Sequence, residues 1–161
     1  MLKSRRKSQA IRQVRQWLDE ETVQYALKEY SSNSFKATLQ LAASFRVAIE
    51  VTEETTDSIR FLSSAYLTPA DQRAFSRLGD LKKDSFLKAV RYSLFSLDVD
   101  HNLVPDGEFL KHISVVKVIY FDGLTKDKFF DTILLLKRAL GLLNLAYYEH
   151  LRYKSSKVIP G

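Results

Sequence analysis

The chain has 161 residues, of which 45% are hydrophobic and 27% charged, and its formal net charge at pH 7 is +6. This length and this composition are typical of one globular domain, and they exclude an intrinsically disordered chain. The absence of cysteine excludes disulfides, thiolate nucleophiles and cysteine zinc sites.

The excess positive charge lies at the start of the chain. The first 16 residues, MLKSRRKSQAIRQVRQ, contain six basic side chains and no acidic one. We predict a flexible basic arm at residues 1–7, a single domain at 8–153 and a frayed tail at 154–161. Because the basic start leads into a charged helix and not into an apolar segment, no secretory signal is expected, and the cytoplasm is the predicted compartment.

A short amphipathic helix is predicted at residues 8–20, and four strands are predicted to follow it. The helix is predicted because its apolar residues share one helical face. These residues are Ala10, Ile11, Val14, Trp17 and Leu18. Apolar and polar residues alternate in the strands, which are expected at 23–27, 35–41, 45–51 and 59–67. Their short connections favour an antiparallel meander with one face in solvent.

Two consecutive helices are predicted after the fourth strand. In the segment LTPADQ, Thr68 suits the N-cap and Pro69 the first helical position. Asp71 takes the third position, where an acidic side chain favours the helix dipole. The helical spacing breaks at Gly79 and then resumes, which indicates a second helix.

Two further strands are expected, at 99–104 and at 112–121. The second contains ISVVKVIYF, which is apolar on both faces. A sheet with one face in solvent does not need this pattern. The face that carries Val116, Val118 and Tyr120 is therefore expected to be covered, either by a helix of the same chain or by another subunit.

A long helix is predicted to close the chain, from Thr125 as its N-cap to about residue 153. Its apolar stripe is wide enough to contact more than one surface. The predicted fold class is α+β, with an antiparallel sheet of about six strands flanked by helices. The predicted element order is α-β-β-β-β-α-α-β-β-α.

The residues that carry chemistry form no recognisable catalytic pattern. The only histidines are His101, His112 and His150, and the acidic segment DVDHNLVPDGEF resembles a cation loop. An EF-hand loop would need glycine where Leu103 stands and glutamate where Phe109 stands, so this match fails. The five glycines are too far apart for a phosphate-binding loop. We predict no catalytic residue, no metal site, no cofactor and no enzyme activity.

The basic start allows two interpretations. Its cations could neutralise phosphates and give salt-sensitive nucleic-acid binding, or they could form a solvated arm that supports solubility. The cations are Lys3, Arg5, Arg6, Lys7, Arg12 and Arg15. Membrane binding is not expected, because the apolar face of the first helix is needed in the core and the longest uncharged apolar-rich stretch near the C-terminus, ALGLLNLAYY, is too short to cross a bilayer.

The segment VIYFDGLTKDKFFDTILLLKRAL at 118–140, supported by LTPADQRAFSRL at 67–78, resembles an uncharacterised archaeal family with a type III secretion chaperone-like fold. The matching residues mark a strand, a turn and the start of a helix: Ile119, Tyr120, Asp122, Gly123, Leu124, Thr125, Asp127 and Phe129. The resemblance covers roughly residues 8–153. It implies a small α+β module, often a homodimer, that binds other proteins, and it brings no catalytic residues.

The sequence therefore predicts a non-enzymatic protein-binding module, chaperone-like or adaptor-like, that acts as a homodimer. The predicted dimer or partner interface consists of Val116, Val118, Tyr120, Leu136, Leu140, Leu143 and Tyr147. The alternative is a nucleic-acid-associated or ribosome-associated accessory protein that uses the basic arm. The absence of cysteine and the low number of asparagines would suit a high-temperature organism.

Overall fold

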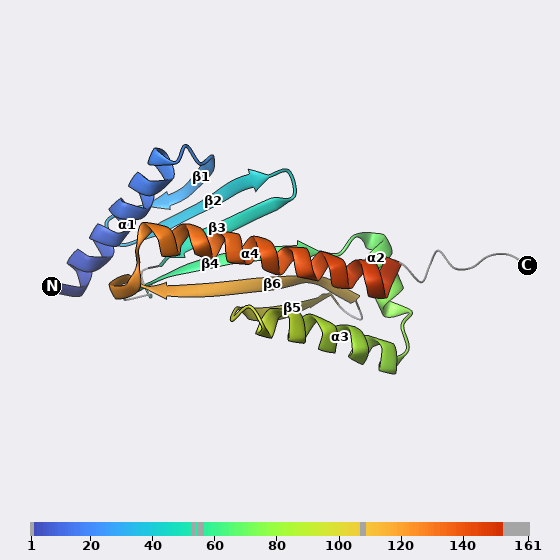
Figure 1. Cartoon of the computed structure of the whole chain (residues 1–161). Helices are drawn as coiled ribbons and strands as arrows, with labels where there is room; N and C mark the ends of the chain where they lie inside the picture. The colour runs from blue at the N-terminus through green and yellow to red at the C-terminus, as the bar shows by residue number, and fades with distance from the viewer. Residues whose placement is uncertain (1, 53, 55–56, 107–108, 153–161) are drawn as a thin grey trace, which may run out of the picture. The chain divides into compact units, whose positions relative to one another are not determined.

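The computed structural model describes residues 2–52, 54, 57–106 and 109–152, and Figure 1 shows their elements. The helices are α1 (Leu2–Glu20), α2 (Pro69–Ser76), α3 (Asp80–Phe95) and α4 (Lys126–Tyr147), with a 3-10 turn at Phe121–Gly123 and a π-helical turn at Tyr148–Arg152. The strands are β1 (Tyr25–Tyr30), β2 (Phe35–Ala42), β3 (Phe45–Val51), β4 (Ser58–Tyr66), β5 (Asp100–Asp106) and β6 (Phe109–Tyr120). The expected tail at 154–161 lies outside the described residues, as do Gly107 and Glu108 of the acidic segment.

The strands form one six-stranded antiparallel sheet in the order β1-β2-β3-β4-β6-β5. Antiparallel pairing joins β1 to β2, β2 to β3 and β3 to β4, as the short connections predict. With α1 before the meander, α2 and α3 before β5, and α4 after β6, the predicted order of elements is confirmed. The α+β fold class is confirmed with it.

The chain divides into two compact units. Unit 1 comprises Met1–Ser63 and Val116–Leu136, and unit 2 comprises Ser64–Val115 and Lys137–Gly161. Three elements, β4, β6 and α4, contribute residues to both units. Each unit therefore consists of segments that are distant in sequence.

The core of unit 1 is formed by alternate strand residues together with α1 and the first half of α4. The buried strand residues are Phe35, Ala37, Leu39, Phe45, Val47, Ile49, Val51, Ile59 and Phe61. Phe129 on α4 is fully buried, and its ring centroid lies 5.3 Å from that of Phe61 and 5.8 Å from that of Trp17 on α1. Aromatic side chains thus join the two distant segments of unit 1.

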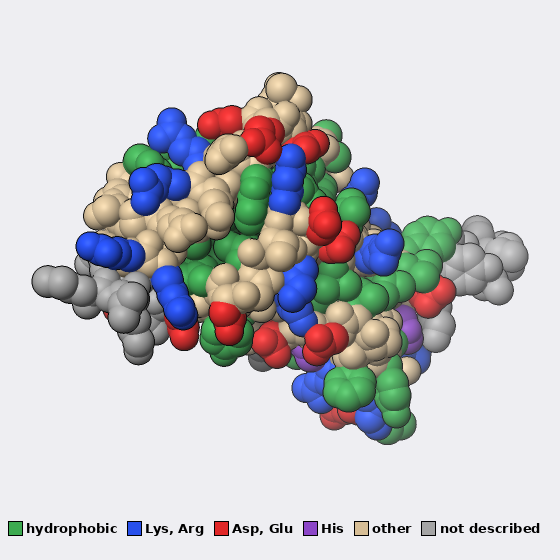
Figure 2. All heavy atoms as spheres, turned by 60° about the vertical axis from the view of Figure 1, so that its left-hand side comes forward, with side chains coloured by type: hydrophobic (Ala, Val, Ile, Leu, Met, Phe, Trp, Pro, Cys, Tyr) green, Lys and Arg blue, Asp and Glu red, His purple; other side chains and the backbone are tan. Residues whose placement is uncertain are grey.

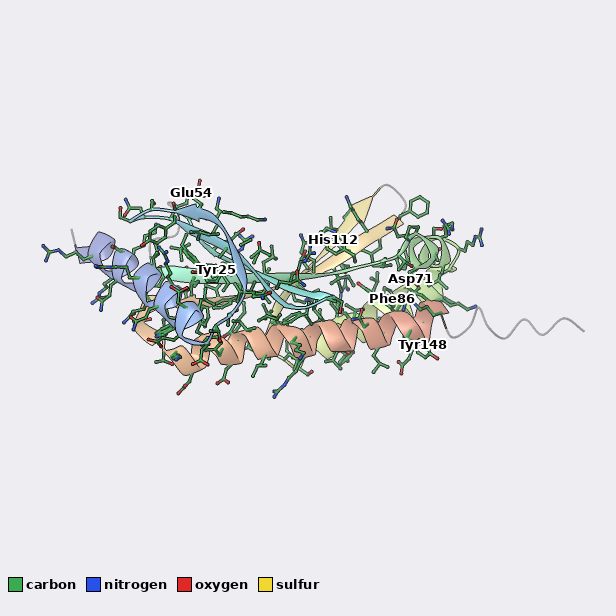
Figure 3. The ribbon with its side chains drawn as sticks, turned by 90° about the horizontal axis from the view of Figure 1, so that it is seen from above. Tyr25, Glu54, Asp71, Phe86, His112 and Tyr148 are labelled. Atoms are coloured by element: carbon green, nitrogen blue, oxygen red, sulfur yellow. The ribbon has the colours of Figure 1, made fainter. Side chains whose placement is uncertain are left out.

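The core of unit 2 is centred on Phe86 of α3, which is fully buried. Its ring centroid lies 5.6 Å from that of Phe75 on α2 and 6.0 Å from that of Tyr147 on α4. The Tyr147 hydroxyl donates to the Ala65 carbonyl at 3.0 Å, which satisfies a polar group inside this core. Figure 3 shows Phe86, Asp71 and Tyr148 gathered around the end of α4.

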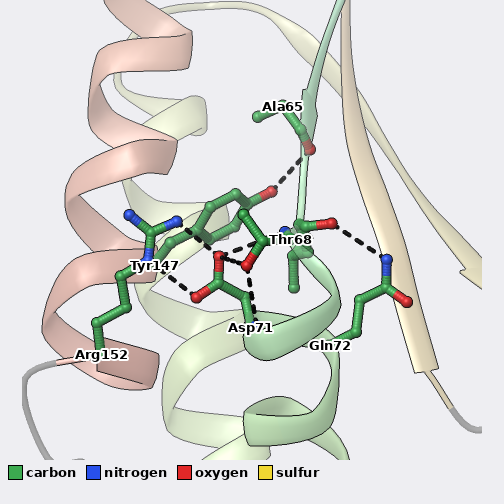
Figure 4. A network of polar contacts seen from close by, with 7 residues as sticks. Ala65, Thr68, Asp71, Gln72, Tyr147 and Arg152 are labelled. Atoms are coloured by element: carbon green, nitrogen blue, oxygen red, sulfur yellow. Dashed lines mark hydrogen bonds and ion pairs between the residues drawn. The ribbon is translucent and has the colours of Figure 1, made fainter.

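A polar network in unit 2 connects the start of α2 to the end of the long helix (Figure 4). Thr68 caps α2 by accepting from the Asp71 amide at 3.2 Å, and Asp71 accepts from the Thr68 amide at 3.3 Å, which is the predicted cap extended to a capping box. Nε and Nη2 of Arg152 donate to the two Asp71 oxygens at 2.8 Å and 2.6 Å. Arg152 and Thr68 hold the pKa of Asp71 below its usual value, so this buried carboxylate is ionised near neutral pH.

Several element boundaries differ from those predicted. α1 begins at Leu2, so residues 2–7, which the charge pattern predicts as a flexible arm, belong to the helix. Lys7 explains this difference, because it is only 6% exposed and its Nζ donates to the Thr52 carbonyl at 2.6 Å. α4 ends at Tyr147, short of the predicted residue 153, and continues as a π-helical turn that brings Arg152 to Asp71.

Candidate protein-interaction surface

The outward face of β6 carries the exposed part of the predicted interface. Val118 is 37% and Tyr120 60% exposed, and Val116 is half-buried. The intervening Ile119 is less exposed than either neighbour, and Val115 is buried. The alternation follows from the pleat of the strand, which sends successive side chains to opposite faces.

Two neighbouring strands complete this surface within unit 1. The Phe121 amide donates to the Asp57 carbonyl at 2.8 Å, where β4 and β6 run beside one another. In the antiparallel register that this bond fixes, Leu62 of β4 lies opposite Val116 of β6. On its other side Leu62 pairs with Ala48 of β3. We name this surface the β6 face and define it by its five outward apolar residues. They are Ala48, Leu62, Val116, Val118 and Tyr120.

An ion pair borders the β6 face. Arg60 and Glu50 are opposite one another in the pairing of β3 with β4, and the Arg60 Nε lies 3.7 Å from a Glu50 carboxylate oxygen. In the β4–β6 register Arg60 also lies opposite Val118. An apolar centre with charged groups at its border is the composition found in protein–protein interfaces.

The four predicted interface residues on α4 lie in the interior of the chain. Leu136, Leu140, Leu143 and Tyr147 are all buried. The apolar residues that α4 exposes are others, with Leu134 and Leu145 each about half exposed. The exposed part of the predicted interface is therefore on β6, and the inner side of α4 serves the core.

The basic residues of the N-terminal segment differ in their exposure. Arg5, Arg6 and Arg12 are exposed on α1, but Lys7 is buried against Thr52. Arg15 is exposed and lies over the Tyr30 ring, 4.8 Å from its centroid, where hydrogen bonding to Tyr30 and Tyr25 raises the pKa of its guanidinium. The side chain of Lys3 lies outside the described residues. On the face shown in Figure 2, the Lys and Arg side chains on the left are separated mainly by other side chains, whereas over the centre and right Lys and Arg mix with Asp and Glu.

The histidines and the acidic segment are dispersed as well. In the part of the chain that the structure describes, no group of three or more His, Asp or Glu side chains could hold a metal ion. His112 packs on Tyr66 with 4.7 Å between ring centroids, and burial lowers its pKa. None of the described helices combines the length and the apolar character needed to cross a bilayer.

Residues 10–145 match a family described as "Uncharacterized conserved protein (DUF2299)". Among solved structures, the chain is similar to an uncharacterized protein from Methanothermobacter thermautotrophicus, with 24% identity and a TM-score of 0.76 over 88% of this chain and 99% of that one. It is also similar to YbjN from E. coli, described as a candidate transcription regulator, with 19% identity and a TM-score of 0.53 over 86% of this chain and 92% of that one. No curated protein matches the chain. The two structures support the fold, and an archaeal protein is among its neighbours.

Proposed function

The chain belongs to the DUF2299 family of uncharacterized conserved proteins, and from its surface we propose that it is a non-enzymatic, cytoplasmic protein-binding module that acts as a homodimer. The β6 face is the observation that carries this proposal. It places the exposed Val118 and Tyr120 beside three half-buried apolar residues on the outward side of the sheet. Contiguous exposed apolar surface of this kind marks interaction sites in soluble proteins.

A second copy of the chain is the proposed occupant of the β6 face. A two-fold dimer brings the same patch of both subunits together, so an apolar patch needs no second, complementary patch elsewhere. The Arg60–Glu50 pair at its border carries no net charge, so the two subunits do not repel one another there. The likeness to YbjN, described as a candidate transcription regulator, is in keeping with an adaptor or regulator that works through protein contacts.

Val118→Asp is expected to convert the dimer into a soluble monomer of 18.6 kDa. The substitution places an unpaired carboxylate in an apolar interface, which costs several kcal/mol, whereas in the monomer the same side chain is in water. Light scattering coupled to size-exclusion chromatography measures the mass. Leu134→Asp, at an exposed apolar position of α4 in the same unit, is the matched control and is expected to remain a dimer. An unchanged dimer mass for Val118→Asp would refute this interface.

A second candidate function, nucleic-acid binding, is supported by the exposed Arg5, Arg6 and Arg12 of α1. If these three guanidinium groups contact phosphates, the logarithm of the RNA-binding constant falls linearly with the logarithm of the salt concentration. Replacing all three by glutamine is then expected to reduce that slope by about 3. Fluorescence anisotropy with a labelled RNA measures the slope. Arg73→Gln with Arg77→Gln is the control, because these two arginines are exposed on α2 and at its C-cap, away from α1 in sequence. A slope that the triple substitution leaves unchanged would argue against α1 as the binder.

A further inference from the structure

The first three strands of unit 1 carry a pocket of about 380 Å³, which we name the β1–β3 pocket. It lies beside the β6 face, because Thr38 in its lining is opposite Ala48 of that face in the pairing of β2 with β3. Its volume is within the range of small-ligand sites, about 300 to 1,000 Å³. Its polar lining residues are Gln24, Tyr25, Lys28, Thr38, Gln40 and Arg46. The described lining therefore contains two cations, Lys28 and Arg46, and no carboxylate.

A β-bulge lies beside each of these two pocket cations. In the pairing of β1 with β2 the register shifts between Leu27 and Glu29, so Lys28 is the extra residue of the bulge. In the pairing of β2 with β3 the register shifts directly after Gln40, which is opposite Arg46. Bulges are frequent beside functional sites, because they interrupt the alternation of a strand and redirect individual side chains. Both cations of the pocket thus occur where the regular ladder is interrupted.

Gln40 holds the guanidinium group of Arg46 in place. Its Oε1 accepts from the Arg46 Nε at 2.5 Å, and its Nε2 donates to the Ala42 carbonyl. Both ends of this half-buried amide are therefore engaged. The contact uses only the Nε of Arg46, which leaves both Nη groups to donate to an oxyanion. A side chain that is oriented before a ligand arrives loses less conformational entropy when the ligand binds.

The first three strands contain two carboxylates, and both pair with cations outside the pocket. Glu29 lies 3.2 Å from Lys36, and Glu50 lies 3.7 Å from Arg60. The tyrosine of the lining donates to Asp19 of α1 at 2.8 Å, so that carboxylate is engaged as well. Among the described residues, no carboxylate forms an ion pair with either pocket cation. The positive charge of the pocket is therefore available to an anion.

We propose that the β1–β3 pocket binds a phosphate monoester. Its two cations match the charge of such a group, which is about −1.5 to −2 at pH 7. The Nη groups of Arg46 donate to two phosphate oxygens, and Lys28 acts as a point charge beside them. Gln24 and Thr38 supply uncharged polar groups for the organic part of the ligand. This inference goes beyond the proposed function, because it assigns a small ligand to residues that are not part of the β6 face.

The test uses the full-length chain labelled with 15N, and phenyl phosphate as the monoester probe at constant ionic strength. Saturable chemical-shift changes are expected in NMR spectra at the amides of Ala26, Thr38 and Arg46. Arg46→Gln is expected to weaken binding at least about 10-fold, as for the loss of a charge-assisted hydrogen bond. Lys28→Gln is expected to weaken it about 3-fold, as for an exposed ion pair. Dimethyl phosphate, a diester with one charge, is expected to bind at least about 3-fold more weakly than the monoester.

Gln40→Ala tests the positioning of Arg46 without a change of charge. It is expected to weaken binding about 3-fold, because the guanidinium group must then be ordered by the ligand. It is expected to have no further effect in the Arg46→Gln background, since the two residues act as one unit. Lys128→Gln is the matched control for lost charge, because Lys128 is exposed on α4 in the same unit. It is expected to leave the affinity for phenyl phosphate unchanged.

Absence of saturable shifts, or shifts confined to residues outside the first three strands, would overturn the inference. Equal losses of affinity in Lys28→Gln and Lys128→Gln would also overturn it, since they would indicate a response to net charge alone. Equal binding of dimethyl phosphate would overturn the assignment of a monoester and favour a nucleic-acid backbone. If phenyl phosphate does not bind while Val118→Asp still converts the dimer into a monomer, this inference is wrong and the proposed function stands.

Discussion

Phe129→Ala is expected to lower the free energy of unfolding by about 4 kcal/mol, within the range for a large aromatic side chain removed from a core. Phe129 is fully buried, and its ring contacts Trp17 of α1, Phe61 of β4 and Phe130 of α4. Its removal leaves a cavity among side chains from three elements, which cannot all move inward to fill it. Urea unfolding followed by far-UV circular dichroism measures the change.

Leu134→Ala is the control for Phe129→Ala, because Leu134 lies on the same helix and is about half exposed. Its effect is expected to stay within about 0.5 kcal/mol, as for most surface substitutions. A loss of less than about 1 kcal/mol for Phe129→Ala would contradict the central position that we assign to Phe129, since core aromatic truncations typically cost about 3–5 kcal/mol.

Asp71→Ala is expected to lower the free energy of unfolding by about 2 to 3 kcal/mol at pH 7. The substitution removes the acceptor of the Thr68 amide and both oxygens that Arg152 contacts. The loss of stability is smaller than for a fully buried ion pair, because the Arg152 side chain is about half exposed and water can solvate it when Asp71 is removed. Urea unfolding of the variant and the parent chain at pH 7 measures the difference.

The contribution of Asp71 to the free energy of unfolding is expected to decrease as the pH is lowered. The pKa of Asp71 is lower in the folded chain than its ordinary value, first because Arg152 donates hydrogen bonds to the carboxylate. The stabilisation is therefore fully present above the unfolded pKa of about 3.9 and is lost as the pH falls through the folded pKa. The difference between parent and Asp71→Ala should shrink below about pH 4. Asp84→Asn, in the exposed pair with Lys88, is the control and should change stability by less than about 1 kcal/mol. A difference that does not change between pH 7 and pH 3 would contradict the role of the ion pair.

Local patterns were sufficient to predict most of the elements. The alternation in β2 and β3 identifies the buried residues from Phe35 to Val51, because in a strand the side-chain period decides the face. Leu41 is the exception, since the register shifts between Gln40 and Ala42 and leaves its side chain exposed. The cap of α2 was equally predictable, since Thr68 and Asp71 are three residues apart and contact one another in any helix that starts there. β1 was harder to predict. A bulge between Leu27 and Glu29 interrupts its alternation.

Features that depend on distant partners could not be predicted from these patterns. Arg152 reaches Asp71 across 81 residues, and the Thr52 carbonyl that accepts from the buried Lys7 ammonium lies 45 residues away. The leucines of α4 posed a different problem. Apolar residues occur around most of the circumference of this helix. Helical spacing alone therefore does not distinguish the buried Leu136 from the exposed Leu134. The strand pattern groups Val118 with Tyr120 on one face and Ile113 with Val115 on the other, but because both faces are apolar it does not tell which of them is exposed.

Unit 1 joins Met1–Ser63 to Val116–Leu136, so its second segment is synthesised well after its first. Synthesis proceeds from the N-terminus at about 5 to 20 residues per second, so roughly 4 to 15 s separate the addition of Ser63 from that of Leu136. Throughout this interval the apolar side of the newly made strands lacks Phe129 and the rest of the segment Val116–Leu136. We expect ribosome-bound chains halted before residue 116 to recruit holdase chaperones and to be cleaved readily by proteases, and chains extended past residue 136 to escape both.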